Sequence, residues 1–370
     1  MDLRLTGAIA EVEPSQWDGL ARGHPFLRHA FLHAFEASEC AGPASGWTPR
    51  HLTLWDGDTL AAAMPLYEKA HSFGEFVFDW AWAEAYQRAG MPYYPKLLCA
   101  VPFTPVQGAR LMARDVAARR LLLDQGLRLA RASGVSSWHV LFPTGEETEL
   151  LAERGLMIRR GVQFHWRNRG YRDVGDFLDT LTRDKRKKIR QERRRVSDAG
   201  VSLLRLTGGA IERRHWEFFF RCYCHTFHDR GRMPYLNLDF FLRIGAALPD
   251  NVLLVVAQRG DTPIAAALDI EDEHRLYGRY WGALEFVSGL HYEACYYQGI
   301  EHCIERGLDL FEGGAQGEHK LARGFEPVAT TSAHWLRDPR FADAVARYLE
   351  RESHGVDLYM DELTEHAPFR

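Results

Sequence analysis

The order of the predicted secondary-structure elements is the same in the two halves of this chain. In each half, helices and an antiparallel hairpin precede one long helix, and two further strands follow it. The first half has a turn at residues 56–58 and a long helix over about 115–133. The second half has a turn at 259–261 and a long helix over 292–306. This repeated order, without a letter-by-letter repeat, predicts two similar α/β (α+β) domains with mostly antiparallel sheets.

The length of 370 residues is too great for one ordinary hydrophobic core and fits two domains. We expect an N-terminal domain over residues 1–170 and a C-terminal domain over 201–370. Between them, residues 171–200 are expected to form one basic linker helix.

The composition is that of a globular protein, with 46% hydrophobic and 26% charged residues. The net charge of −4 argues against a protein that coats nucleic acid in general. No apolar run approaches the roughly 18 residues of a membrane span, and the N-terminus lacks a signal peptide's apolar core. Six cysteines without paired spacing fit a reducing compartment. We therefore expect a cytoplasmic protein with no membrane span.

The expected linker helix is the most basic part of the chain. Residues 183–195 hold nine Lys or Arg and two acids, a local balance of +7. Apolar residues form one narrow stripe along the helix, so it can pack while its other faces stay cationic. It is either a solvated face or a contact for phosphate or RNA. On the second interpretation the candidate donor-binding residues are Lys185, Lys187, Lys188 and Arg190.

A glycine-rich segment over residues 311–327 carries the strongest chemical signal. Its glycines let a ligand approach the main chain closely. Acids, an imidazole and two cations lie among them: Glu312, Glu318, His319, Lys320 and Arg323. Residues 276–282 and 308–312 flank one helix, so we expect neighbouring parallel strands with a ligand site beyond their carboxyl ends. The alternative is a surface loop with solvated charges.

The first half contains an unusual group of aromatic and charged residues around a proline-broken loop. Candidate ligand-facing members of this group are Asp79, Trp82, Tyr94 and Lys96. They either cap a core or form the wall of a binding site. Two histidines, His225 and His228, share one helical face, but we expect an ordinary helix end there and no metal site.

Six blocks distributed over most of the chain have a combination of residues specific to one group of proteins. These blocks are Asp79–Ala83, Tyr93–Leu97, Val101–Pro105 with Gly108 and Arg110, Lys185–Arg193, Gly278–Gly282 and Glu312–Lys320. In them the chain resembles the FemAB-like branch of the GNAT acyltransferase superfamily, often labelled peptidoglycan biosynthesis or recognition proteins.

The resemblance implies a tandem pair of GNAT-like domains around a central cleft. The better-understood Fem relatives transfer an aminoacyl group from aminoacyl-tRNA to an amine of a peptidoglycan precursor. This chain has one predicted helix where those relatives have a long coiled-coil arm. Ordinary GNAT enzymes hold acyl-CoA in a Gln/Arg-x-x-Gly-x-Gly/Ala loop. Residues 283–291 lack that pattern, and Gly108 and Arg110 belong to a fragment of it, so both are donor-binding candidates.

We therefore expect an N-acyltransferase or aminoacyltransferase that acts on an amine of a peptide-like or amino-acid-derived acceptor. The donor is aminoacyl-tRNA or acyl-CoA, with tRNA as a possible partner and no covalently bound cofactor. Glu318 or His319 is the expected proton acceptor, with Glu312 as a substitute. Anion binding is assigned to Lys320, Arg323 and Arg279, and the shape of the acceptor pocket to Tyr280 and Trp281.

Two rival functions stay open. The first is a CoA-dependent N-acetyltransferase of a small amine with a degenerate pyrophosphate loop. The second is a non-catalytic module that recognises peptidoglycan precursors or RNA.

Overall fold

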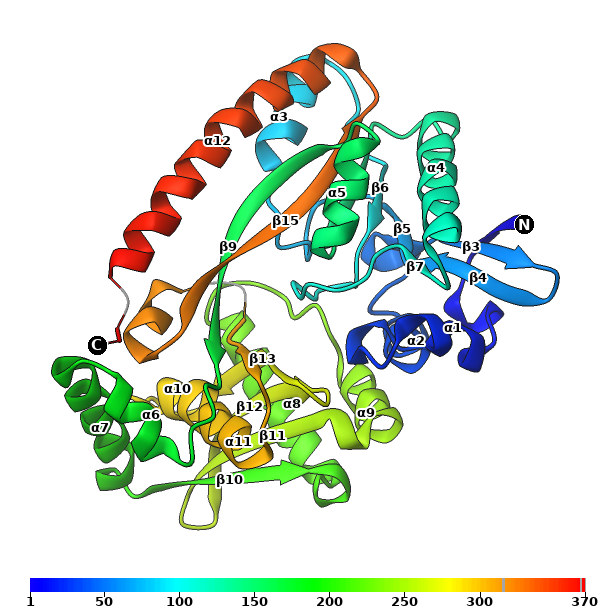
Figure 1. Ribbon diagram of the computed structural model, residues 1–370. Coiled ribbons are helices and arrows are strands. Elements are labelled where there is room, and N and C mark those ends of the chain that lie inside the picture. Colours follow the sequence, from blue (N-terminus) through cyan, green and yellow to red (C-terminus); the bar gives the residue numbers. More distant parts are fainter. Residues whose placement is uncertain (315–316, 367, 370) are drawn as a thin grey trace. The chain divides into compact units, whose positions relative to one another are not determined.

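The computed structural model describes residues 1–314, 317–366 and 368–369. It has a mixed α/β fold with mostly antiparallel sheets (Figure 1), as the sequence predicts. The chain forms two compact units: unit 1 is Met1–Gly161 with Ala329–Leu358, and unit 2 is Val162–Val328 with Tyr359–Arg370. The predicted divisions after residues 170 and 200 do not coincide with these units. The reason is that β9 (Met157–Arg167) and β15 (Glu326–Leu336) each continue from one unit into the other.

Unit 1 contains two sheets and the helices that cover them. Its strands are β1 (Asp2–Thr6), β2 (Trp47–Pro49), β3 (His51–Asp56), β4 (Thr59–Met64), β5 (Leu66–Lys69), β6 (Lys96–Cys99), β7 (Met112–Ala113) and β8 (Ser137–Leu141). Its helices are α1 (Pro14–Ala21), α2 (His29–Ala37), α3 (Trp80–Arg88), α4 (Val116–Ala132) and α5 (Gly145–Glu153). The strand orders are β1-β3-β4-β7 and β15-β8-β6-β5-β2, and β6 and β8 are parallel. The C-terminal helix α12 (Pro339–Glu365) begins in unit 1 and ends in unit 2.

The predicted hairpin and long helix of the first half are confirmed. Strands β3 and β4 pair antiparallel around residues 57–58. Helix α4 begins directly after Asp115, whose carboxylate accepts a hydrogen bond from the Ala118 amide at 2.8 Å and caps the helix. Apolar residues of α4 and α5 pack on one face of the sheet against Trp138 and Val140 of β8. The other face of β8 carries Ser137 and His139, because successive side chains of a strand alternate.

Unit 2 is built on one sheet with the order β10-β11-β12-β13-β14-β9. After β9 come α6 (Val174–Thr180), α7 (Arg183–Asp198), β10 (Val201–Thr207), α8 (Arg213–His228), α9 (Leu238–Ala247), β11 (Val252–Arg259), β12 (Thr262–Glu271) and β13 (Arg275–Ala283). A helix then runs through α10 (Leu290–Tyr292), a π-helical turn (Glu293–Tyr297) and α11 (Gln298–Arg306), which confirms the predicted second long helix. The short β14 (Leu310–Glu312) and a 3-10 helix (Glu318–Arg323) complete the unit before β15.

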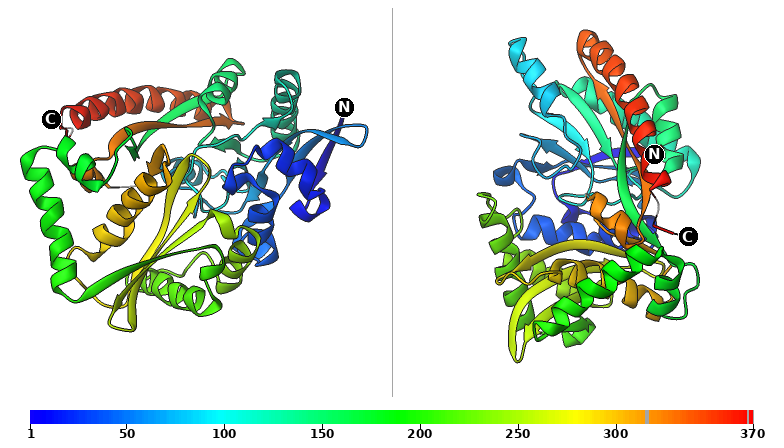
Figure 2. Two further views of the ribbon diagram at one scale, coloured as in Figure 1. Left: turned by 60° about the horizontal axis from the view of Figure 1, so that its bottom comes forward. Right: turned by 90° about the vertical axis from the view of Figure 1, so that its left-hand side faces the viewer.

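Residues 171–200 do not form a single linker helix, which corrects the prediction. They fold into α6 and α7, both in unit 2, and α7 leads directly into β10 (Figure 2). Ile189 and Val196 of α7 are buried in the apolar clusters of this unit, as the predicted stripe requires. The helix is therefore packed on unit 2, because its apolar stripe contributes to the core there.

The expected parallel neighbours of the second half are confirmed. Strands β13 and β14 pair in parallel at Arg275–Leu310, Leu276–Phe311 and Tyr277–Glu312. Strand β14 ends at Glu312, whereas β13 continues to Ala283. We call the point where the two strands separate, just beyond Tyr277 and Glu312, the fork of unit 2.

Among the described residues, no helix is long and apolar enough to cross a membrane.

Candidate functional site

Glu312 lies at the fork of unit 2 and is 3% exposed. Its Oε1 accepts a hydrogen bond from Arg275 Nη1 at 3.3 Å, and its Oε2 has no hydrogen-bond partner in the described part of the chain. Burial raises the pKa of Glu312 to about 7, although Arg275 opposes this shift. A carboxyl group that titrates near neutral pH is suited to accept or donate a proton in catalysis.

A histidine accompanies this carboxyl group from the neighbouring strand. His165 of β9 is paired with Glu312 in the sheet, and its Nε2 lies 3.9 Å from Glu312 Oε2. Burial lowers the pKa of His165 to about 3, and Arg275 adds to the effect. The imidazole is therefore neutral at physiological pH and adds no positive charge beside the Glu312 carboxylate.

Three glycines bring the main chain of β13 close to the segment that follows β14. A Cβ atom on Gly278 would lie 3.4 Å from the Glu312 carbonyl oxygen, and one on Gly314 would lie 3.4 Å from the Gly278 carbonyl oxygen. A Cβ atom on Gly313 would lie 2.6 Å from the Phe325 ring. The glycines thus allow a close approach of the two main-chain segments at the fork, and the Phe325 ring packs against Gly313. Ala315 and Gln316 of the glycine-rich segment lie outside the described residues.

Lys320 is buried beside the same segment. Its Nζ donates a hydrogen bond to the Gly314 carbonyl oxygen at 2.9 Å. Burial lowers the pKa of Lys320 to about 8. The side chain supplies a positive charge in a poorly solvated place, where an interaction with an oxyanion is stronger than in water. Its predicted role in anion binding is compatible with this position.

Glu318 and His319, the first candidates for proton acceptor, are exposed. Glu318 Oε1 accepts a hydrogen bond from Tyr359 at 2.6 Å, and His319 Nε2 is 3.0 Å from the Tyr296 hydroxyl. Desolvation lowers the pKa of His319, and Arg323 and Lys320 add to this. Within the described residues, no hydrogen bond or ion pair joins either side chain to Glu312. Of the three candidates, Glu312 is the buried one, and burial raises its pKa.

Arg323 takes part in a structural ion pair. Its Nη2 donates to Glu192 Oε1 of α7 at 2.6 Å, its Nη1 bonds the His319 carbonyl oxygen, and its guanidinium stacks on Tyr292 at 3.4 Å. Glu192 also accepts a hydrogen bond from the Tyr297 hydroxyl. Because a buried carboxylate already neutralises the guanidinium, the predicted role of Arg323 in anion binding does not fit.

A bulge divides the predicted acceptor-binding residues between the two faces of the sheet. Leu268 is opposite Tyr280 and Asp269 is opposite Gly278, so Arg279 is the extra residue on β13. Tyr280 packs against Tyr223 of α8, whereas Trp281 contacts His291 of α10. The Arg279 guanidinium lies 5.1 Å from the Tyr280 ring. Strict alternation would have placed Arg279 and Trp281 together, and the bulge separates them.

Gly108 and Arg110 occupy the corresponding place in unit 1, where the parallel strands β6 and β8 end. Arg110 is buried, with Nε donating to the Leu141 carbonyl oxygen at 2.8 Å and Nη2 to the Val106 carbonyl oxygen at 2.6 Å. The Gly108 amide donates to the Phe142 carbonyl oxygen at 3.1 Å. Both residues hold the chain across the ends of the strands through these hydrogen bonds, and their predicted role in phosphate binding does not fit this position.

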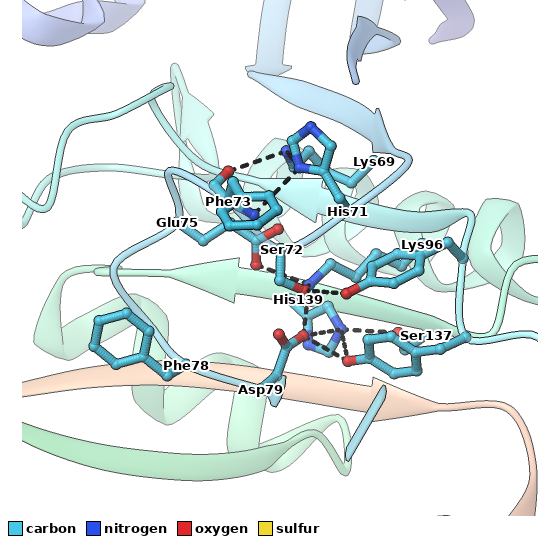
Figure 3. Close-up of polar contacts among 12 residues, drawn as sticks. Lys69, His71, Ser72, Phe73, Glu75, Phe78, Asp79, Lys96, Ser137 and His139 are labelled. Carbon is cyan, nitrogen blue, oxygen red and sulfur yellow. Dashed lines mark hydrogen bonds and ion pairs between the residues drawn. The ribbon is translucent and has the colours of Figure 1, made fainter. Parts of the chain in front are cut away.

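The other four candidates of unit 1 do come together, in a buried polar cluster (Figure 3). Lys96 Nζ lies 2.5 Å from Asp79 Oδ2 and 2.8 Å from Glu75 Oε2. Tyr94 joins through Ser72, whose Oγ is 2.8 Å from both the Tyr94 hydroxyl and Lys96 Nζ. Trp82 lies over this cluster, with its ring centroid 4.9 Å from that of His334.

The ion pairs decide the charge state of this cluster. Burial alone would lower the pKa of Lys96, but Glu75 and Asp79 outweigh it and raise that pKa. Burial likewise disfavours the Asp79 carboxylate, but Lys96 and His139 hold the pKa of Asp79 well below its usual value. Sequence reasoning missed Lys69, Ser72, Glu75, His139 and His334 of this cluster. The signal available was the alternation of polar and apolar residues along β8.

The cationic residues of α7 remain available to a partner. Lys187, Lys188 and Arg190 are exposed and Lys185 is half-buried. None of the four forms an ion pair with any carboxylate of the described chain. No group of His, Cys, Asp and Glu side chains able to hold a metal ion is found among the described residues.

Comparison with known proteins identifies related sequences and folds. The family model described as FemAB-like, peptidoglycan biosynthesis/recognition, matches residues 8–370. No curated protein is significantly similar to the sequence. Among solved structures, FemX is similar with a TM-score of 0.57 at 12% identity, covering 94% of this chain and all of FemX.

Two further solved structures have the same fold. L-PGS from Bacillus licheniformis gives a TM-score of 0.53 at 12% identity, covering 87% of this chain and 95% of that one. A C-terminal DUF2156 domain from Agrobacterium fabrum gives 0.55 at 10% identity, covering 91% and 96%. At these identities the similarity establishes the fold and leaves the reaction to be argued from the site.

Proposed function

Because the chain belongs to the FemAB-like family, we propose that it is an acyltransferase that forms an amide bond at the fork of unit 2. The donor is an ester or thioester, and the acceptor is an amine of a peptide-like or amino-acid-derived molecule. The observation that carries this proposal is the buried carboxyl group of Glu312 at the point where β13 and β14 separate. Two glycines follow it, and Lys320 is bonded to the carbonyl oxygen of the second, Gly314.

The proposed reaction requires a proton acceptor for the attacking amine. The amine nitrogen forms a bond to the donor carbonyl carbon, the ester or thioester bond breaks, and one proton leaves the nitrogen. Glu312 is suited to take that proton because its carboxyl group titrates near pH 7 and one oxygen has no partner in the described chain. The same proton can then pass to the leaving alkoxide or thiolate.

Negative charge develops on the carbonyl oxygen during the attack. The Lys320 ammonium is buried at the segment that follows β14, where an electrostatic interaction is weakly screened. Lys320 therefore stabilises the oxyanion in this proposal, and a positive charge held before reaction needs no reorganisation as the charge forms.

The two parallel pairs of strands favour unit 2 as the site. In unit 1 the end of the β6–β8 pair is covered by residues 100–110, with the guanidinium of Arg110 bonded to two carbonyl oxygens. In unit 2 the equivalent position has glycines and two groups that titrate near neutral pH. We infer that only unit 2 carries out the transfer.

The exposed cations of α7 favour a donor rich in phosphate, and we propose aminoacyl-tRNA over acyl-CoA. Lys187, Lys188 and Arg190 lie on the exposed side of a helix whose other side packs on unit 2. Such a row binds a phosphate backbone through counterion release, and the affinity then falls steeply with salt. The family resemblance agrees with this donor, whereas an intact pyrophosphate loop for CoA is missing from the sequence.

The test is a transfer assay with labelled aminoacyl-tRNA and labelled acetyl-CoA, using amine-bearing peptides as acceptors. We expect transfer from aminoacyl-tRNA, a loss of roughly 10²–10⁴-fold in turnover in Glu312→Gln, and near-normal turnover in the control Glu318→Gln. A triple Lys187→Glu, Lys188→Glu, Arg190→Glu variant should weaken tRNA binding and reduce its salt dependence.

Three outcomes would contradict parts of this proposal. Transfer from acetyl-CoA alone identifies the CoA-dependent rival. Binding of RNA or of a peptide without any transfer identifies a non-catalytic recognition module. Full activity of the Glu312→Gln variant would show that the fork of unit 2 is not the catalytic centre.

A further inference from the structure

One face of the sheet in unit 1 carries buried charges where an apolar surface is usual. Lys69 of β5 is directly opposite Lys96 of β6, so the two side chains share a face. The next strand, β8, adds Ser137 and His139 to this face. Both lysines are 0% exposed. Because an unpaired buried charge is costly, this layer requires an explanation beyond packing.

The segment that covers the lysines, residues 70–79, buries its polar side chains and exposes aromatic ones, the opposite of the usual pattern. Its buried side chains are Ser72, Glu75 and Asp79, and it exposes Phe73 and Phe78 at 53% each. Figure 3 shows Phe78 pointing away from the polar cluster while Glu75 and Asp79 point into it. The polar groups of the segment, and not its aromatic rings, therefore hold it on the sheet.

The carboxylates of the segment form ion pairs with Lys96 and not with Lys69. Lys96 Nζ contacts Glu75, Asp79 and Ser72, whereas no carboxylate oxygen of the described chain lies within 4.0 Å of Lys69 Nζ. Lys69 rests on the Trp47 ring at 3.8 Å and donates to the Phe73 carbonyl oxygen at 3.3 Å. Among the described residues, the buried Lys69 side chain thus has no ion-pair partner.

The acids themselves are also incompletely satisfied. Glu75 Oε1 and Asp79 Oδ1 have no hydrogen-bond partner in the described residues. Burial raises the pKa of Glu75 to about 7, and burial lowers the pKa of Lys69 to about 7. With these polar atoms lacking hydrogen-bond partners, the packing of residues 70–79 on the sheet is less stable than a fully hydrogen-bonded arrangement would be.

We propose that Lys69 and Lys96 form an oxyanion-binding site, which residues 70–79 occupy with their own carboxylates in this state. A carboxylate or phosphate group of a ligand would replace Glu75 beside the two ammonium groups, and the segment would move outward. The site lies in unit 1 and is independent of the transfer proposed for unit 2.

Glu75→Gln tests the proposal by removing the internal competitor while keeping its size and a hydrogen-bond acceptor for Lys96. We expect glutarate or pyrophosphate to bind about tenfold more tightly than to the wild-type protein, because the ionised form of Glu75 no longer competes with the anion for the two lysines. Isothermal titration calorimetry with each anion measures this, and the tighter of the two identifies the carboxylate or the phosphate as the source. The control Glu84→Gln, an exposed acid of α3, should not change binding.

Lys69→Met is the second variant, made alone and together with Glu75→Gln. In the double variant, Lys69→Met should abolish the tighter anion binding that Glu75→Gln produces. Hydrogen exchange of residues 70–80 gives a readout that does not need the Glu75 variant, because saturating anion should speed exchange there in the wild-type protein and not in Lys69→Met. The proposal is overturned if Glu75→Gln folds and binds both anions within twofold of the wild type. It is equally overturned if exchange of residues 70–80 does not respond to either anion.

Discussion

Glu312→Gln offers a test of the electrostatics of the fork that needs no substrate. The carboxyl group is 3% exposed, and burial raises its pKa from the ordinary value of 4.5 to about 7. The folded protein therefore binds this proton more tightly than the unfolded chain does. Glutamine has nearly the shape of the protonated acid and cannot ionise.

The sign and size of the effect follow from this shift. Below pH 4.5 both states hold the proton, and the acid contributes its full stability. As the pH rises from 4.5 to 7 that stability is lost, because the buried carboxyl group must ionise without adequate solvation. Since each tenfold change in proton affinity corresponds to about 1.4 kcal/mol, the total loss is about 3 kcal/mol. The variant should escape this loss.

Urea denaturation at several pH values between 4.5 and 8 measures the difference. We expect the free energy of unfolding of Glu312→Gln, relative to the wild type, to increase by about 3 kcal/mol across this range. Glu318→Gln is the matched control, and because its side chain is exposed its curve should run parallel to that of the wild type. A Glu312→Gln curve parallel to the wild type would refute the raised pKa and the reasoning built on it.

Two further predictions follow from the same unit. Turnover should rise as the pH increases through about 7, where Glu312 loses its proton. It should fall above about pH 8, where Lys320 loses its proton. A turnover rate that does not change between about pH 6 and pH 9 would contradict both roles. Arg323→Met should destabilise unit 2 by roughly 3–5 kcal/mol, because it leaves Glu192 charged and buried. Adding Glu192→Gln should recover part of that loss in urea denaturation, and an equal or larger loss in the double variant would show that packing dominates.

The sequence was sufficient to predict the parallel pair of β13 and β14, because a crossover helix between two strands makes them parallel neighbours. It also named Glu312, but only as a substitute for Glu318 or His319, because all three acids and bases fall in the glycine-rich segment after a short strand. The environment of Glu312 was not predictable. Arg275 and His165 reach it through strand pairings that join residues far apart in the chain.

The site predictions that fit the structure poorly have local physical causes. Arg279 is an extra residue in β13, and a bulge is set by the pairing with β12, which periodicity does not reveal. An arginine near a glycine suggests a phosphate site in the sequence, whether its side chain is exposed or buried. The Arg110 side chain is buried and donates hydrogen bonds to two carbonyl oxygens instead. For Ser137 and His139, alternation along the strand predicts a solvated face, and only the covering segment 70–79 and helix α3 bury them.

The two parallel pairs of strands show how far the repeated units have diverged in chemistry. In unit 1 the groups that titrate near pH 7, Lys69 and Glu75, lie near the start of β6, and its other end is covered by residues 100–110. In unit 2 Glu312 titrates in that range at the opposite, carboxyl end, where the strands separate. A substrate must contact main-chain and side-chain atoms of the site at the same time. The separated ends of β13 and β14 allow such contact, whereas the end of the β6–β8 pair is covered by residues 100–110. The same architecture therefore suits charge-based binding in unit 1 and proton transfer in unit 2.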